Sequence, residues 1–299
     1  MIYQSCAICE KNNYRVVYKE NFDISKINSR IFSARRLPDK IHYQMVRCKK
    51  CGLLYSTPIL PLNKINKLYR QSFTSYGKHI NNLKQTYGTY LKQLEKYQIN
   101  KNKLLEIGCG NGFFLEEAQK QGYKETWGIE PGKKSVARAS PKIKKNIIID
   151  IFRPGLFKKN FFDVICCFQT FDHIPDPNLF LKECYKILKN NGFLLFLNHN
   201  AESLSAQILG EKSPIIDIEH TYLYSKKTLG LILTKHNFKP IEVKTALNTH
   251  SLTYWIHLFP LSKSFKLNLI KLLKKMSMAD INITLPAGNL VVVAQKTTS

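Results

Sequence analysis

Four cysteines near the amino terminus have the residue type and spacing of a metal site. Cys6 and Cys9 form one C-x-x-C pair, and Cys48 and Cys51 form a second. Each pair can present two thiolates from one tight turn, and four thiolates complete the tetrahedral ligand set that zinc prefers. Residues 1–57 are therefore expected to fold as a zinc ribbon with an inserted loop. Four protein ligands leave no open position, so the predicted role of the zinc is structural.

A glycine-rich turn is the second stretch with chemical potential. In the run LLEIGCGNGFFLEEA, residues 104–118, an apolar strand reaches Glu106 and then Gly108, Gly110 and Gly112 at alternate positions. These glycines let the backbone turn tightly and approach a ligand, and the following helix directs N–H groups at it. The carboxylate of Glu106 would repel a pyrophosphate but can pair with a cationic ligand. Glu130, which ends the next predicted strand, can accept ribose hydroxyls.

Strand and helix patterns alternate from residue 103 onward. Short apolar runs predict strands, and amphipathic runs, including one over residues 176–192 with a glycine stop, predict helices between them. The alternation predicts an α/β fold with a doubly wound, mostly parallel, seven-stranded sheet, whose ligands bind at the carboxyl ends of the strands. We divide the chain into the ribbon (1–57), a helical linker or lid (58–102) and the α/β domain (103–299).

The whole set of motifs resembles that of class I S-adenosylmethionine-dependent methyltransferases, which have a Rossmann-like sheet. The runs LLEIGCGNG, GIEP, IIIDIF, FDVICCFQTFDHIPDP and LKNNGFLLF match successive family motifs, and GNLVVVAQK resembles the family's last, antiparallel strand. The resemblance covers about residues 104–296 and implies that the α/β domain binds S-adenosylmethionine. The cofactor contacts that it implies are Glu106, Gly108, Gly110, Gly112, Glu130, Asp150, Ile151 and Gln169.

Histidines after two of the predicted strands are candidates for a general base. His173 follows the fourth strand, and His220 stands beside Glu219 in an irregular region after the fifth. An imidazole next to a carboxylate can accept a proton from a nucleophile, which accelerates methyl transfer. We predict His220 and His173 as catalytic residues. A purely structural role is the alternative for both, and for His199 as well.

The net charge of +25 is the extreme value of the composition. Such a field attracts nucleic acid, anionic lipid or nucleotide-linked substrates, but the lysines are spread along the whole chain, as in any lysine-rich protein. The sequence contains no run long and apolar enough for a transmembrane segment, and we expect a cytoplasmic protein. The helix predicted at 263–275 has one apolar face, for which packing on the domain is expected over peripheral contact with a membrane.

Three functions are compatible with these observations. The first is methyl transfer to oxygen or carbon of a small-molecule acceptor, because the ribbon resembles that of a bacterial subfamily acting on sugars and other small metabolites. The second is methylation of RNA or protein, with the ribbon and the positive field binding the polymer. The third is a noncatalytic, zinc-containing interaction protein, against which the complete set of cofactor residues argues. The sequence is silent on the acceptor and on the oligomeric state.

Overall fold

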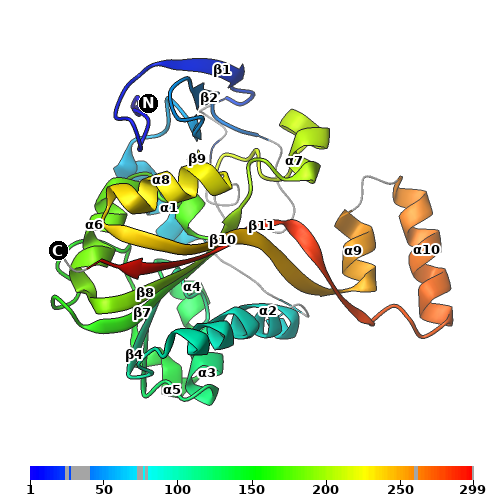
Figure 1. Ribbon diagram of the computed structural model, residues 1–299. Coiled ribbons are helices and arrows are strands. Elements are labelled where there is room, and N and C mark those ends of the chain that lie inside the picture. The colour runs from blue at the N-terminus through cyan, green and yellow to red at the C-terminus, as the bar shows by residue number, and fades with distance from the viewer. Residues whose placement is uncertain (24–26, 28–40, 73–76, 78–79, 259–261, 298–299) are drawn as a thin grey trace.

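The computed structural model describes residues 1–23, 27, 41–72, 77, 80–258 and 262–297. Most of the loop predicted between the cysteine pairs, part of the helical linker and residues 259–261 lie outside these ranges. The described residues form two sheets, of seven and four strands. Figure 1 shows helices on both sides of the larger sheet and the smaller sheet near the amino terminus.

The larger sheet has the predicted number of strands and is mostly parallel. Its order is β10-β11-β8-β7-β4-β5-β6, and β11 runs antiparallel to both of its neighbours. The strands are β4 (Lys103–Ile107), β5 (Glu125–Ile129), β6 (Ile147–Ile148), β7 (Phe162–Phe168), β8 (Leu188–His199), β10 (Phe238–Ser251) and β11 (Asn282–Lys296).

Alternate residues of each central strand enter two different hydrophobic cores. Leu104 and Val164 face one core, whereas their neighbours Leu105 and Ile165 face the other. This follows from the twofold side-chain period of a strand, and both faces are apolar because helices cover both. In Figure 1, α6 and α8 lie above the sheet and α2, α3 and α5 below it. The helices are α2 (Ile80–Gln93), α3 (Phe113–Lys120), α4 (Lys133–Val136), α5 (Pro141–Lys144), α6 (Pro177–Ile187) and α8 (Lys226–Lys235).

The smaller sheet contains the cysteine-rich segment and one strand from far along the chain. Its order is β1-β2-β3-β9, and all of its pairings are antiparallel. The strands are β1 (Tyr14–Tyr18), β2 (Met45–Cys48), β3 (Leu54–Ser56) and β9 (Tyr222–Leu223). The ribbon residues Cys6, Val46 and Tyr55 belong to the same hydrophobic core as the upper face of the large sheet. The two sheets are therefore packed as one body.

One predicted boundary is wrong. The helix expected to continue to Gly192 ends at Ile187, and β8 begins at Leu188, which pairs with Phe162 of β7. Helix periodicity continues through this segment, but pairing with a neighbouring strand overrides it. Asn191 adopts a left-handed conformation (φ 60°) before Gly192, and the register of β8 against β7 shifts between Phe162 and Val164.

The remaining helices connect or extend these layers. These helices are α1 (Leu62–Gln71), α7 (Leu204–Leu209), α9 (Leu252–Leu258), α10 (Lys263–Lys275) and the 3-10 turns η3 (Leu94–Tyr97), η4 (Phe171–His173) and η5 (Gly210–Lys212).

No helix in the described part of the chain is both long and apolar enough to cross a bilayer.

Asp163 joins three strands at the amino edge of the large sheet, and its replacement tests that connection. Its carboxylate accepts a hydrogen bond from the backbone N–H of Lys103 (2.9 Å) and two from Nζ of Lys189 (2.8 and 2.9 Å). We expect Asp163→Ala to lower the free energy of unfolding by about 1–3 kcal/mol, because the partly buried N–H of Lys103 loses its acceptor. Urea denaturation measures this value. Asp280→Ala, at an exposed position, is the control, and an equal effect of the two changes would contradict the assignment.

Candidate functional site

The glycine turn after β4 has the backbone geometry that close approach to a ligand requires. Gly108, Gly110 and Gly112 all have positive φ, of 80°, 55° and 73°. A Cβ at Gly108 would also lie 2.4 Å from Oγ1 of Thr170, so neither the backbone nor the available space admits a side chain there. The helix α3 begins directly after Gly112. The turn therefore has the left-handed backbone and the close packing that require glycine at these positions.

Two buried carboxylates flank the turn. Glu130 accepts hydrogen bonds from the backbone N–H groups of Gly110 (3.0 Å) and Gly132 (2.8 Å), which aim its side chain at the turn. Burial raises the pKa of Glu130, although these two N–H groups oppose the effect. Glu106 is only 2% exposed, and burial, followed by the charge of Glu130, raises its pKa well above the ordinary value. A ligand with a positive charge would stabilise both carboxylates.

Buried polar atoms without partners gather at the carboxyl ends of the strands. Burying such an atom without a hydrogen bond costs about 1–3 kcal/mol, so native proteins retain few of them away from ligands or water. Five residues at or just beyond the ends of β4, β7 and β8 carry one or two each, with no partner among the described residues. They are Glu106 (Oε2), Asn111 (Oδ1), Gln169 (Oε1), Asp172 (Oδ1) and Asn198 (Oδ1 and Nδ2).

The carboxylate of Asp150, another predicted cofactor contact, is hydrogen-bonded to two arginines. Asp150, beyond β6, accepts hydrogen bonds from Arg70 (2.6 Å), Arg153 (2.9 Å) and the backbone N–H of Ile151 (2.8 Å). Burial opposes ionisation of Asp150, but these donors outweigh it and lower its pKa. Arg70 comes from α1, so the linker helix reaches across to the α/β domain.

Gln169 adopts a left-handed conformation (φ 50°) directly after β7, a backbone strain that is typical of functional sites.

Three histidines come together beside Asp172, next to the ends of β7 and β8. The ring centroids of His173 and His199 each lie 4.7 Å from that of His220. Nδ1 of His199 lies 2.6 Å from Oδ2 of Asp172, and burial opposes ionisation of this aspartate, but its interactions with His199 and the other two histidines outweigh burial and lower its pKa. The three histidines thus converge from separate segments of the chain. Neither their spacing in the sequence nor the periodicity of the sequence predicts this convergence.

The histidines differ in burial and in hydrogen-bond partners. His220 is buried and His173 is half-buried, and desolvation followed by neighbouring imidazoles lowers both of their pKa values, to about 3 for His173. Nδ1 of His220 lies 2.8 Å from the carbonyl oxygen of Ile215, which assigns the proton to Nδ1 and the lone pair to Nε2. His199 keeps a quarter of its side chain exposed and has a carboxylate partner. An incoming hydroxyl can therefore reach His199 from solvent.

Sequence reasoning missed the contributions of α1 and β8. Tyr69 on α1 lies with its hydroxyl 3.2 Å from Nδ1 of His173, directly before Arg70, the partner of Asp150. Two adjacent residues of α1 thus contact His173 and Asp150. Asn198 had a signal in the sequence, since it is the polar residue that ends the apolar run FLLFL. Tyr69 had none, because its role depends on where the linker packs.

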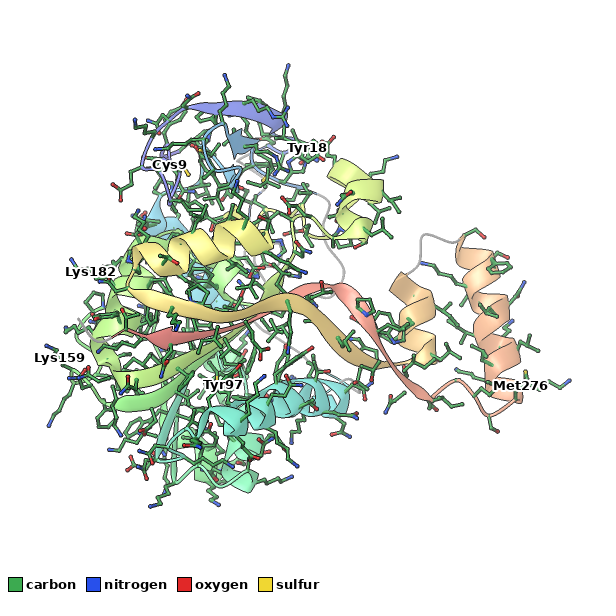
Figure 2. All side chains as sticks on the ribbon, in the orientation of Figure 1. Cys9, Tyr18, Tyr97, Lys159, Lys182 and Met276 are labelled. Atoms are coloured by element: carbon green, nitrogen blue, oxygen red, sulfur yellow. The ribbon has the colours of Figure 1, made fainter. Side chains whose placement is uncertain are left out.

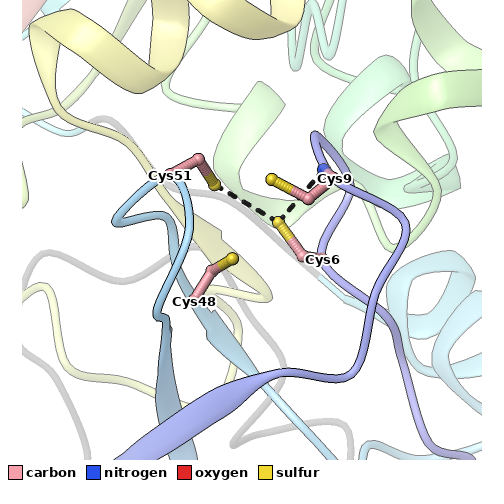
Figure 3. A group of neighbouring side chains, drawn as sticks. All are labelled: Cys6, Cys9, Cys48 and Cys51. Carbon is pink, nitrogen blue, oxygen red and sulfur yellow. Dashed lines mark hydrogen bonds between the residues drawn. The ribbon is translucent and has the colours of Figure 1, made fainter.

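The four amino-terminal cysteines converge as predicted. The Sγ atoms of Cys6 and Cys51 lie 3.4 Å apart, and all four Sγ atoms lie within 4.8 Å of one another (Figure 3). All four are free thiols, and a tetrahedron of Zn–S bonds of about 2.3 Å would place sulfurs about 3.8 Å apart. Burial opposes ionisation of Cys48, but the N–H groups of Cys51 and Lys50 and neighbouring thiols lower its pKa to about 7, whereas burial raises the pKa values of Cys6 and Cys51. The cluster therefore fits a tetrahedral thiolate site.

Comparison with known proteins identifies the family. A model described as a methyltransferase domain matches residues 79–243, which is more than half of the chain. The ubiquinone biosynthesis O-methyltransferases of Histophilus somni and Vibrio campbellii are each 30% identical, over 50% and 55% of this chain and 68% and 71% of the relatives. That of Pelagibacter ubique is 37% identical over 36% of this chain, and the match spans about half (47%) of the relative.

A solved structure shares the fold. A chain in the complex between the Haloferax volcanii Trm112 methyltransferase activator and a methyltransferase aligns with a TM-score of 0.50 and 12% identity, covering 74% of this chain and 95% of that one. This identity is low enough that the similarity concerns the fold alone. Together with the strand order, the glycine turn and the family match, it establishes that the chain belongs to the class I S-adenosylmethionine-dependent methyltransferases.

Proposed function

We propose that this methyltransferase transfers a methyl group to a hydroxyl oxygen of a small-molecule acceptor. The observation that carries the proposal is the set of buried polar atoms, unpartnered among the described residues, on Glu106, Gln169, Asp172 and Asn198 at or just beyond the carboxyl ends of β4, β7 and β8. The glycine turn follows β4, and His173 and His199 lie just beyond β7 and at the end of β8, so cofactor and acceptor would meet at one edge of the sheet. The relatives named O-methyltransferases support oxygen as the acceptor atom.

The cofactor residues proposed from the sequence fit S-adenosylmethionine in chemistry. When bound, this cofactor supplies a methyl group already activated on a sulfonium. Glu106 would face the cationic amino-acid end of the cofactor. The backbone of the turn from Gly108 to Gly112 would lie against the cofactor, and Glu130 would accept hydrogen bonds from its ribose hydroxyls. We retain Asp150, Ile151 and Gln169 as further contacts, with Asp150 held in place by Arg70 and Arg153.

We assign the proton transfer to the histidine cluster. Nε2 of His199 would accept the proton of the acceptor hydroxyl, and Asp172 would stabilise the resulting imidazolium through Nδ1. His220 and His173, our two sequence-based candidates, are held neutral by burial and would orient the hydroxyl through hydrogen bonds. Tyr69 would fix the ring of His173.

We propose a structural zinc ion on Cys6, Cys9, Cys48 and Cys51, with an indirect role in the reaction. The second cysteine pair forms the turn between β2 and β3, and β3 binds the segment that carries His220. Ser56 donates a hydrogen bond from Oγ to the carbonyl oxygen of His220 (3.0 Å), and its N–H binds the carbonyl oxygen of Thr221 (2.9 Å). The metal would thus stabilise the position of one of the three histidines.

The overall function is tested by calorimetric titration with S-adenosylmethionine, with NAD as control, followed by assays for S-adenosylhomocysteine release. The acceptor panel comprises a catechol, nucleotide sugars and an RNA oligonucleotide. We expect saturable binding of S-adenosylmethionine alone and turnover with a hydroxylated small molecule. A sugar or glycan precursor remains the narrower hypothesis from the sequence. Turnover confined to RNA would refute the proposal.

The raised pKa of Glu106 makes cofactor affinity depend on pH. A cationic ligand favours the ionised carboxylate, so the carboxyl group must lose its proton on binding, and affinity should rise as the pH increases through the raised pKa of Glu106. Glu106→Gln should bind more weakly and with a flatter pH profile, measured by calorimetry at each pH. Adenosine, which lacks the cationic end, is the control ligand. A wild-type profile as flat as that of the variant would show that Glu106 does not face the cation.

Replacement of the histidines tests their roles. We expect His199→Asn to lower kcat by about 10²- to 10⁴-fold without changing cofactor affinity, because the general base is lost. His220→Asn and His173→Asn should raise KM for the acceptor more than they lower kcat. His257→Asn, an exposed histidine on α9, is the control. A kcat loss confined to His220→Asn would transfer the role of base to that residue.

Zinc removal is expected to affect the acceptor side first. Mass spectrometry of digested protein should find about one zinc per chain, and Cys48→Ser should lose it, whereas Cys184→Ser, at a buried free thiol, should keep it. Because β3 holds the His220 segment, mild chelation should lower turnover before it lowers cofactor affinity. A metal-free wild-type protein with full stability and activity would contradict this assignment.

A further inference from the structure

The insertion between the last two strands forms an arm that leaves the body of the molecule. We use the name arm for residues 247–287, whose described parts are the outer hairpin of β10 and β11 with α9 and α10. Pairing of β11 with β8 ends at Asn289 opposite His199. The outer hairpin, from Leu247 paired with Pro286 to Ser251 paired with Asn282, therefore has no further partner strand among the described residues. Figure 1 shows α9 and α10 beyond the end of this hairpin, away from the sheet.

Specific contacts hold the arm in this position. Nε1 of Trp255 on α9 donates a hydrogen bond to the carbonyl oxygen of Ile283 (2.9 Å), and the N–H of Leu252 binds the carbonyl oxygen of Ile281 (2.9 Å). Nζ of Lys266 on α10 binds the carbonyl oxygen of His257 on α9 (2.9 Å). At its base, the hydroxyl of Tyr90 on α2 binds the backbone of Leu247. The arm is therefore a structured extension, stabilised by hydrogen bonds within it and at its base.

The outer face of α10 is apolar and uncovered. Phe265, Leu272 and Met276, which follow at intervals of seven and four and so share one helix face, are 56%, 53% and 57% exposed. Figure 2 shows Met276 at the outer end of the arm. The expectation that this helix packs on the domain is wrong: its main contact is α9, and within it only Ile270 is buried among the described side chains. Large exposed apolar patches mark sites of association.

The positive charge of the arm favours an anionic partner. Between Leu252 and Ala279 the chain has no Asp or Glu, and α10 contributes Lys263, Lys266, Lys271, Lys274 and Lys275. A second copy of this arm would bring lysines against lysines, whereas anionic lipid offers the opposite charge and an apolar interior together. A lysine-rich amphipathic helix with large apolar residues on one face is the form that lies in a membrane interface.

We propose that the arm docks the protein on an anionic phospholipid surface, with the apolar face of α10 in the interface. The arm starts at the edge of the sheet that holds His199, because Asn289 pairs with that residue. Docking would therefore place the methyl-transfer site at the base of the arm that contacts the bilayer. On the basis of the proposed function, a membrane-borne acceptor follows, but docking itself requires neither cofactor nor acceptor.

Vesicle co-sedimentation of the full chain tests the proposal. We compare vesicles of phosphatidylcholine alone with vesicles containing phosphatidylglycerol, at low and high salt. We expect binding to the anionic vesicles that weakens at high salt, where charges are screened. The double changes Phe265→Ser with Leu272→Ser, and Lys271→Glu with Lys274→Glu, should each reduce partitioning about tenfold. Leu179→Ser with Leu231→Ser, exposed leucines on α6 and α8, is the matched control and should bind as wild type.

Every other outcome counts against the proposal. Absence of wild-type binding to anionic vesicles would overturn it, as would equal loss in the control variant. A dimer detected by light scattering that the Phe265→Ser with Leu272→Ser change dissolves, without vesicle binding, would assign the face to a second copy. Thermal unfolding by circular dichroism verifies that the variants fold. Titration with S-adenosylmethionine in the same preparations separates failure of docking from failure of the proposed methyl transfer.

Discussion

The pairing of β3 with β9 is the interaction on which the arrangement of the site depends. It connects a strand from the first sixty residues with one that follows residue 220, and Tyr55 and Tyr222 stack across it with ring centroids 5.8 Å apart. The ribbon and the upper face of the large sheet share one hydrophobic core around this pair. The segment before β9 carries His220, so its position follows from the ribbon as much as from the methyltransferase domain. The ribbon is thereby part of the site's support.

A second constraint is electrostatic. Glu106, Glu130 and Asp172 are each buried beyond nine-tenths at one edge of the sheet, although the protein as a whole carries a large positive charge. Burying a carboxylate lowers stability unless it is paired, and these three carboxylates differ in their hydrogen-bond partners. Asp172 has His199, Glu130 has two backbone N–H groups, and Glu106 has no partner for Oε2 among the described residues. Glu106, the least satisfied of the three, is the residue that we propose faces the cationic end of the cofactor.

The linker helix α1 and the arm show how additions to the common sheet shape such a site. Through Tyr69 and Arg70, α1 contacts both the histidine cluster and Asp150. The arm extends the two strands at the other side of the sheet past the end of β8. Both additions lie beside the carboxyl ends of the strands, where loops can approach the ligands without disturbing the core.

The sequence by itself determined the features that local geometry encodes. The cysteine spacing, the glycine turn with its positive φ angles and the alternation of strands and helices all act within a few residues, so they could be read directly. Only the tertiary structure decided which distant segments meet: Asp172 with His199, Tyr69 with His173, and β9 with the ribbon. It also decided that α6 ends at Ile187 and that α10 leaves the domain. These outcomes depend on pairing and packing between segments far apart in the chain, whose free energies no local pattern contains.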